Sequence, residues 1–240
     1  MSPWIPIPTF VVTPVFQILF FAYVGRTAGV GSDTCFLIGN AIRYASIPCL
    51  FAMGNTIGGE RYTHTLGLLL VSPARRVPLF LGRALPVIVN GLVCSPPALV
   101  VGALALHVSL PLASMPLLVV VVSVSALSCT GLGLVTAALA LRGRETSVLS
   151  NIAMGVLLIF CGVNVALSSM PALMATVRRY LPLTHGIEAA RALVAGASWG
   201  QVAGLVATEA AVGLANLVIG LLALTHFERE SRRSATLEVA

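Results

Sequence analysis

The chain alternates between long apolar runs and short segments that carry most of its charge. Each run is about 20 residues long, enough to cross a hydrocarbon core about 30 Å thick. The runs lack the period-2 alternation of a barrel strand, and a sheet with open edges cannot satisfy its backbone in lipid. The pattern therefore predicts an all-α membrane protein with one transmembrane domain over residues 1–240 and no soluble domain.

We predict six spans, so that the protein is multi-pass. The fourth is longer than one straight crossing needs, and we expect it to tilt or to extend past the membrane. The first run contains three prolines and no basic segment precedes it, which does not fit a cleavable signal. The predicted spans are 7–24, 35–57, 84–106, 113–141, 147–169 and 201–225.

Composition agrees with this class, and the arginines give the orientation. Hydrophobic residues make up 58% of the chain and charged residues 9%, against roughly 25% charge in soluble domains. With six spans, both termini share a side with loops 58–83 and 142–146. That side holds most of the arginines, which predicts cytoplasmic termini in a cell membrane. Those arginines are Arg61, Arg75, Arg76, Arg83, Arg142, Arg144, Arg229, Arg232 and Arg233, against Arg26, Arg178, Arg179 and Arg191 on the other side.

Several function classes lose support at this point. The net charge of +6 follows topology, and no basic face with stacking aromatics indicates a nucleic-acid partner. All 14 basic residues are arginine. Without lysine the chain cannot hold a Walker A loop or a Schiff-base cofactor, so any ATP must bind to another polypeptide. HExxH and GxSxG are absent, and the cysteines and histidines are dispersed. We expect no catalytic, metal or cofactor site in this chain, and cysteines that act as packing residues.

The charged segment 58–83 interrupts the apolar pattern after the second predicted span. Gly58-Gly59 is predicted to end that span and to permit a change of direction. A short helix from Glu60 to Val71 would follow, with an apolar stripe, until Ser72-Pro73 stops it. Arg75 and Arg76 come next, suited to lipid phosphates or an acidic partner surface. The residues alone leave two interpretations open, a topological anchor at the interface or a docking element.

The same segment, GERYTHTLGLLLVSPARRVPLFLGR, resembles the loop after the second span in permeases of the type-2 ABC exporter family. That loop usually reads E-R-E-x-G-T-L-x-x-L, followed by a proline and basic residues. Tyr62 stands here where an acid is usual and His64 where a glycine is usual. The matching positions are Glu60, Arg61, Thr65, Leu66, Leu69 and Pro73.

A second stretch, LPLTHGIEAARALVAG (residues 181–196), resembles the family's sequence before the last span. Its matching positions are Pro182, Glu188, Ala189 and Arg191. With the six-span layout, the resemblance covers nearly the whole chain. One difference is that members often begin with a cytoplasmic amphipathic helix, whereas only Met1 to Pro6 precede the first predicted span.

The resemblance implies a half-transporter in which two permease chains associate and each docks a separate cytoplasmic ATPase that binds ATP and Mg. The helix at 60–71 would be the coupling helix. The segment 171–198 would form short re-entrant helices at the outer side of the membrane. Its own pattern fits, since prolines punctuate it and Glu188 and Arg191 lie at i, i+3. An ordered external loop is the alternative.

Two ionisable residues fall inside predicted spans. Arg43 and Glu209 each lie about eight residues, or roughly 12 Å, from the external end of a span. An ionised group there costs about 3 kcal/mol, so such residues are usually paired or face water. We hypothesise that Arg43 and Glu209 pair, within one chain or across the dimer. Alternatively, backbone groups or water satisfy each one separately. Four span residues are expected to join helices by hydrogen bonds: Asn40, Asn151, Asn164 and Asn216.

The nature of the cargo is the least constrained point. Between Leu81 and His226 the only aromatic residues are Phe160, Tyr180 and Trp199. A transport path with few aromatic side chains favours a lipophilic drug, antibiotic or lipid as cargo. A sugar would be expected to stack on aromatic faces. Three functions remain: an ATP-driven exporter of amphipathic molecules, the same machinery moving a lipid-linked polysaccharide, and a channel, secondary carrier or membrane enzyme that needs no ATPase.

Overall fold

The structure is a computed structural model. It describes residues 6–29, 32–62, 82, 85–86, 89, 96, 99–108, 110–111, 114–142, 146–164 and 172–234. In these residues all regular secondary structure is helical, which confirms the predicted all-α class.

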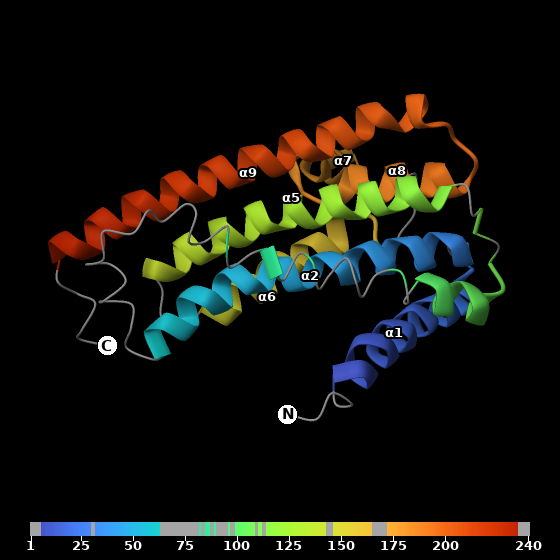
Figure 1. Ribbon diagram of the computed structural model, residues 1–240, viewed down its shortest axis with the longest axis horizontal. Coiled ribbons are helices and arrows are strands. Elements are labelled where there is room, and N and C mark those ends of the chain that lie inside the picture. Colours follow the sequence, from blue (N-terminus) through green and yellow to red (C-terminus); the bar gives the residue numbers. More distant parts are fainter. Residues whose placement is uncertain are drawn as a thin grey trace.

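Five long helices form an elongated bundle (Figure 1). Helices α2, α5 and α9 run in one direction along the bundle, and α1 and α6 run in the opposite direction. Residues 99–106 are also helical. The long helices are α1 (Pro6–Ala28), α2 (Asp33–Tyr62), α5 (Met115–Arg142), α6 (Thr146–Phe160) and α9 (Trp199–Ser234).

Three of these helices contain stretches long and apolar enough to cross a membrane. The stretches are Asp33–Ala52 in α2, Met115–Leu139 in α5 and Trp199–Phe227 in α9. Shorter apolar helical stretches cover Val15–Thr27 and Ser147–Phe160. Lipid is the environment in which such surfaces are stable, so the chain is embedded in a membrane.

The second predicted span does not end at Gly58-Gly59, which corrects that prediction. Helix α2 continues through both glycines to Tyr62. A glycine inside a helix costs about 1 kcal/mol relative to alanine but breaks the helix only where the backbone turns left-handed. Glu60 and Arg61 therefore belong to the last turn of α2, rather than to a separate helix after a bend.

Of the fifth predicted span, 147–169, the structure describes residues as far as 164, and the helix α6 ends at Phe160. Residues 161–164 leave the helical path, and Gly162 takes a φ of 71°. The 15 residues of α6 are about 22 Å long at 1.5 Å per residue, shorter than the hydrocarbon core. A continuous apolar run in the sequence concealed this break.

Helices α5 and α9 share the most extensive contact in the bundle, and glycines let their backbones approach. A Cβ on Gly131 would lie 2.6 Å from the Gly213 carbonyl oxygen, and one on Gly213 would lie 2.7 Å from the Cα of Ser128. Farther along, a Cβ on Gly220 would lie 3.0 Å from the Cβ of Leu134. Because both residue numbers rise together from contact to contact, the two helices are parallel.

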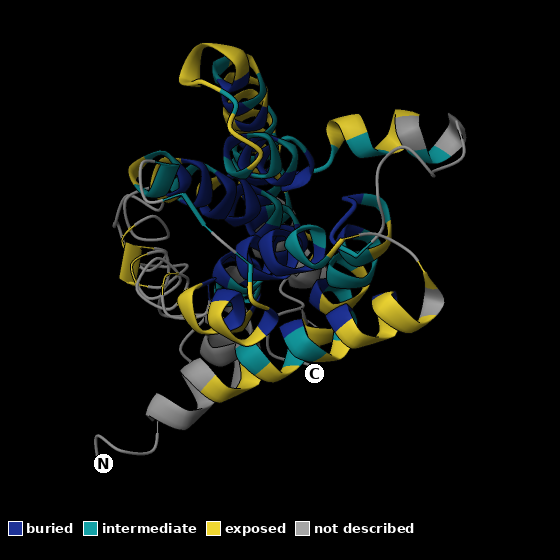
Figure 2. Cartoon of the chain, turned by 90° about the vertical axis from the view of Figure 1, so that its right-hand side faces the viewer, coloured by how far each residue is buried: buried dark blue, intermediate teal, exposed yellow. Residues whose placement is uncertain are grey.

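Burial separates inner from outer helices. Of the apolar stretches, 67% in α2 and 61% in α5 is buried within the chain, against 22% in α9. Buried residues occupy the middle of the bundle and exposed ones its outer faces (Figure 2). Large apolar side chains are exposed on α1 and α9, among them Phe16, Phe20, Leu214 and Leu222. These faces suit lipid or another apolar surface rather than water.

Many polar side chains inside the long helices bond to a carbonyl one turn earlier in the same helix. This pattern satisfies a hydroxyl or amide without a partner helix, as a low-dielectric environment requires. The donors of this kind include Ser46, Ser123, Thr130, Thr136, Asn151, Thr208 and Asn216.

The turn between α1 and α2 is closed by an ion pair. The Arg26 Nε atom donates to the Asp33 carboxylate at 2.9 Å, and the guanidinium lies 5.4 Å from the centre of the Tyr23 ring. Both charged side chains are partly exposed. Exposed pairs contribute little stability, so this contact mainly fixes the geometry of the turn.

We predict that Gly213→Val destabilises the protein by about 1–3 kcal/mol, because the new side chain would force α9 away from Ser128. Thermal unfolding of the detergent-solubilised protein measures the change. Gly204→Val on the same helix is the control, since no atom lies within 4 Å of the added Cβ. Equal effects of the two substitutions would contradict the close contact.

Candidate functional site

Polar and charged side chains gather where a set of short helices lies against the long ones. The short helices are α7 (Ala172–Val177), the 3₁₀ helix η3 (Arg178–Tyr180) and α8 (Thr184–Val194). They occupy the segment predicted to be re-entrant. Helix α8 contacts α2, α5 and α9. The candidate site is this junction around α8.

Glu209 lies at the centre of the junction and is completely buried. Its Oε1 atom accepts a hydrogen bond from the Leu183 backbone N–H at 2.7 Å, and its Oε2 atom accepts one from the Gly186 N–H at 3.1 Å. These two donors are the N-cap and N3 positions of α8. Helix N-termini attract anions, because their first N–H groups are unpaired and the helix dipole is positive there.

This arrangement replaces a capping box by one side chain from another helix. In a capping box the N-cap side chain bonds to the N3 N–H, while the N3 side chain bonds to the N-cap N–H. Here Leu183 is the N-cap and makes no side-chain cap bond, and Gly186 has no side chain. The Glu209 carboxylate serves both donors from α9. The start of α8 thus depends on α9.

The backbone before α8 adopts an unusual conformation to meet this carboxylate. Leu183 has a φ of 75°, in the left-handed region, although its side chain is buried. Such a conformation costs a non-glycine residue about 1–2 kcal/mol. The two bonds to Glu209 and the burial of the leucine side chain offset this cost.

Small residues bring α5 close to the same point. The Ser128 hydroxyl donates to the Glu209 carbonyl oxygen at 3.3 Å. A Cβ on Gly186 would collide with the Ser125 hydroxyl. The cap is therefore a three-helix contact of α5, α8 and α9 that has no room for larger side chains.

Arg191 secures the other end of α8. Its Nη2 atom donates to three backbone carbonyls, those of Cys35 at 2.9 Å, Gly162 at 2.8 Å and Val163 at 3.1 Å. Cys35 lies in the first turn of α2, and the other two residues follow the end of α6. A Cβ on Gly39 would lie 3.0 Å from the same Nη2 atom. Arg191 thus ties α8 to α2 and to the end of α6.

Arg43 and Glu209 are not brought together within the chain. Both carboxylate oxygens of Glu209 bond to α8, and among the described residues no ion pair joins them to Arg43. Arg43 is 8% exposed, and its Nε and Nη1 atoms have no hydrogen-bond partner among the residues that the structure describes. Glu209 is instead satisfied by backbone groups. Pairing across two chains would require its carboxylate to leave α8.

Two of the four intramembrane asparagines join separate segments. The Asn40 amide nitrogen donates to the Asn164 Oδ1 atom at 2.8 Å and to the Phe36 carbonyl at 3.0 Å. Asn151 and Asn216 donate to carbonyls of their own helices. The expectation of interhelical bonding therefore holds for Asn40 and Asn164, whereas the other two make bonds within α6 and α9.

The remaining motif residues are placed as follows. The Pro182 carbonyl, just before α8, accepts a bond from the Cys161 thiol at 3.1 Å. Glu188 lies in the middle of α8 and is partly exposed. Of the coupling motif, Glu60 and Arg61 lie in the last turn of α2. The rest of that motif lies outside the described residues: Thr65, Leu66, Leu69 and Pro73.

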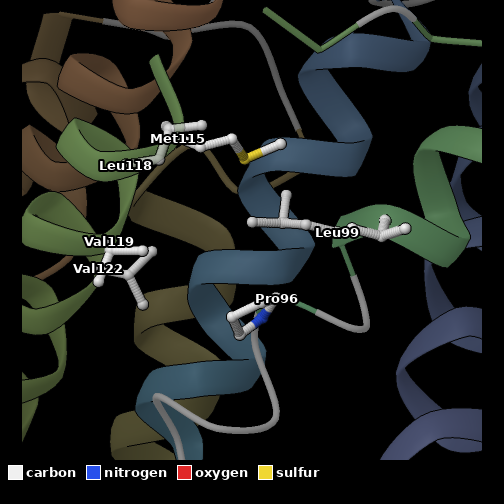
Figure 3. Close-up of a pocket in the computed structure, with 7 residues that line it drawn as sticks. Pro96, Leu99, Met115, Leu118, Val119 and Val122 are labelled. Atoms are coloured by element: carbon white, nitrogen blue, oxygen red, sulfur yellow. The ribbon is translucent and has the colours of Figure 1, made fainter. Parts of the chain in front are cut away.

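One apolar hollow of about 50 Å³ lies beside α5. Met115, Leu118, Val119 and Val122 face Pro96 and Leu99 across it (Figure 3). All of its lining side chains are apolar. In the described part of the chain, no three histidine, cysteine or acidic residues form a group able to hold a metal ion.

These features define a helical membrane protein whose buried charges hold helices together, in a chain that contains no lysine. The sequence matches the family model described as ABC-2 family transporter protein over residues 10–225. The chain belongs to this family and is a membrane permease subunit of an ABC transporter. The family implies an ABC ATPase subunit as partner. Comparison with curated proteins gives no match.

Sequence reasoning missed the partners of Glu209. The donors are backbone groups of Leu183 and Gly186, which leave no polar pattern in a sequence. One signal was available: the first turn of α8 contains no acidic residue, and Leu183 offers no capping oxygen. An uncapped helix start needs an acceptor from elsewhere in the chain. The intramembrane Glu209 could therefore have been predicted as that acceptor.

We predict a coupling energy of about 0.6–1.7 kcal/mol between Asn40 and Asn164, the range of interhelical bonds in membrane proteins. A double-mutant cycle with Asn40→Leu and Asn164→Leu measures it through thermal unfolding. Asn151→Leu combined with Asn40→Leu is the control and should be additive, since the Asn151 amide donates within α6. Additivity of the first pair would show that the bond contributes nothing.

Proposed function

We propose that this permease works as one of two membrane chains in an ATP-driven exporter of lipophilic or amphipathic molecules. A separate cytoplasmic ATPase would dock on each chain, and nucleotide-driven closure of the ATPases would alternate access to the cargo. Membership in the ABC-2 family is the observation that carries this proposal. The lysine-free sequence supports it, because the energy source must then come from another polypeptide.

The course of α2 supports the segment at Glu60–Pro73 as the docking element. Helix α2 is continuous from Asp33 to Tyr62, without a break at the glycine pair. Its apolar stretch is 67% buried, and its first turn contacts Arg191. A push on the motif would be transmitted along one helix to the junction around α8. Any difference in partner choice from relatives would lie at Tyr62 and His64.

The directions of the helices support six crossings with both termini in the cytoplasm. Helices α2, α5 and α9 are parallel, so an odd number of further crossings must separate each from the next. Along the chain, α6 follows α5 and precedes α9, and it runs in the opposite direction to both. Residues 99–106 belong to the crossing expected in the sequence between α2 and α5. The arginine distribution supports termini on the cytoplasmic side of a cell membrane.

The character of the buried surfaces supports an apolar cargo. The core of the described helices consists mostly of leucine, isoleucine, valine and alanine. The hollow beside α5 is lined by apolar groups only. A lipid-linked polysaccharide would need polar or aromatic contacts along its path. Two associated chains would enclose a larger passage than the single chain provides.

Reconstitution with the ATPase that accompanies this chain tests the proposal. The complex in vesicles is offered a fluorescent amphipathic dye, a fluorescent phospholipid or a lipid-linked oligosaccharide. We expect the first two to stimulate ATP hydrolysis and to be moved outward. Stimulation by the oligosaccharide alone would favour the glycan exporter. Cargo movement by the chain without any ATPase would overturn the proposal.

We predict that Leu69→Glu reduces the amount of ATPase retained on the purified permease by about tenfold or more, as expected for an apolar anchor at the centre of an interface. Quantitative co-purification from membranes measures the loss. Ala74→Glu adds the same charge beyond Pro73, where the predicted helix stops, and should retain the ATPase. If both variants retain it fully, the docking element lies elsewhere.

A further inference from the structure

Helix α8 is fixed at its two ends to different parts of the bundle. Its first turn bonds to Glu209 of α9, beside Ser128 of α5. Its last turn bonds through Arg191 to the start of α2 and the segment after α6. A helix of 11 residues is about 16 Å long and too short to bend appreciably. It therefore acts as a stiff link between these two parts.

The attachment at Glu209 depends on a single carboxylate. It consists of two hydrogen bonds to one carboxylate, and Leu183 stays in the left-handed region while they hold. Loss of the carboxylate would leave two buried N–H groups unpaired, which favours local opening over an intact but unsatisfied helix start. The Leu183 backbone could then relax to a common conformation.

We propose that Glu209 and Arg191 are positioning residues that make α8 a tie from α9 to the start of α2 and the segment after α6. When the transporter changes its access, α8 transmits movement between α9 and these two segments only while both of its ends are attached. This inference rests on the alternating access proposed above. It assigns Glu209 and Arg191 a role in coupling. That role differs from cargo binding and from the ion pair with Arg43 that was hypothesised for Glu209.

The chain contains its own probe for release of the tie. The Cys161 thiol is completely buried and bonds to the Pro182 carbonyl, directly before the capped turn. If the turn lifts, Cys161 becomes accessible. Cys129 is equally buried and serves as the internal reference, because it lies within α5, whereas the Cys161 thiol bonds to the turn itself.

The test labels the full permease, in membranes with its ATPase, with N-ethylmaleimide and reads each cysteine by peptide mass. We expect Glu209→Gln to speed labelling of Cys161 by about tenfold or more while Cys129 stays unlabelled. Glu209→Asp keeps the charge with a shorter reach and should give an intermediate rate. Thr208→Val, on the exposed neighbour whose hydroxyl bonds within α9, should match the native rate.

Two results would overturn the proposal. One is an unchanged Cys161 rate in Glu209→Gln. The other is Cys129 labelling that rises in step with Cys161 in the Gln and Asp variants, since the carboxylate would then merely hold the fold together. If Glu209→Gln fails to accumulate, the Cys161 labelling rate is measured in Glu209→Asp instead. It is also measured in Arg191→Gln, which releases the opposite end of α8.

Transport coupling gives a second readout. We expect Glu209→Gln and Arg191→Gln each to lower cargo-stimulated ATP hydrolysis by about fivefold or more. Cargo-stimulated ATP hydrolysis in the double variant should be no lower than in the less active single variant, because a tie detached at one end transmits nothing. Multiplying effects would refute the tie. If the native complex shows no ATP-driven transport, the proposed function fails, while the Cys161 rates still decide whether α8 is tied.

Discussion

Helix ends placed inside an apolar protein are the constraint on which this structure depends. A span that crosses the membrane leaves its unpaired N–H and C=O groups near water, but the first turn of α8 lies buried against other helices. Its first N–H groups are matched with a glutamate, and its last turn contributes an arginine to the carbonyls of α2 and the end of α6. The sign of each charge suits the backbone atoms that it meets.

This use of charge explains why the two most obvious intramembrane ions do not pair. An ion pair satisfies two side chains with each other and leaves backbone groups unpaired nearby. In this protein the carboxylate of Glu209 is better used on two buried N–H groups, because no side chain of α8 can reach them. Arg43 remains buried, and its Nε and Nη1 atoms have no partner within the described part of the chain.

The sequence predicted the helical class, the apolar stretches and the family motifs, since these depend on composition and local pattern. It failed where one residue decides between continuing and breaking a helix. Gly58 and Gly59 are kept within α2, whereas Gly162 follows the end of α6 at positive φ, although all three lie within or beside apolar runs. The difference is set by tertiary contact: the carbonyls of residues 162 and 163 bond to Arg191. Such contacts between distant residues cannot be derived from local pattern.

The glycine contacts between α5 and α9 have a consequence for how the bundle can move. Interdigitated side chains allow helices to slide in small steps as rotamers change. Backbone atoms that touch directly have no such freedom, and a slide by one turn, about 5.4 Å, would place Leu217 rather than Gly213 against Ser128. The shear is thereby blocked. Helices α5 and α9 form one rigid body, and the hinges of any conformational change must lie outside this pair.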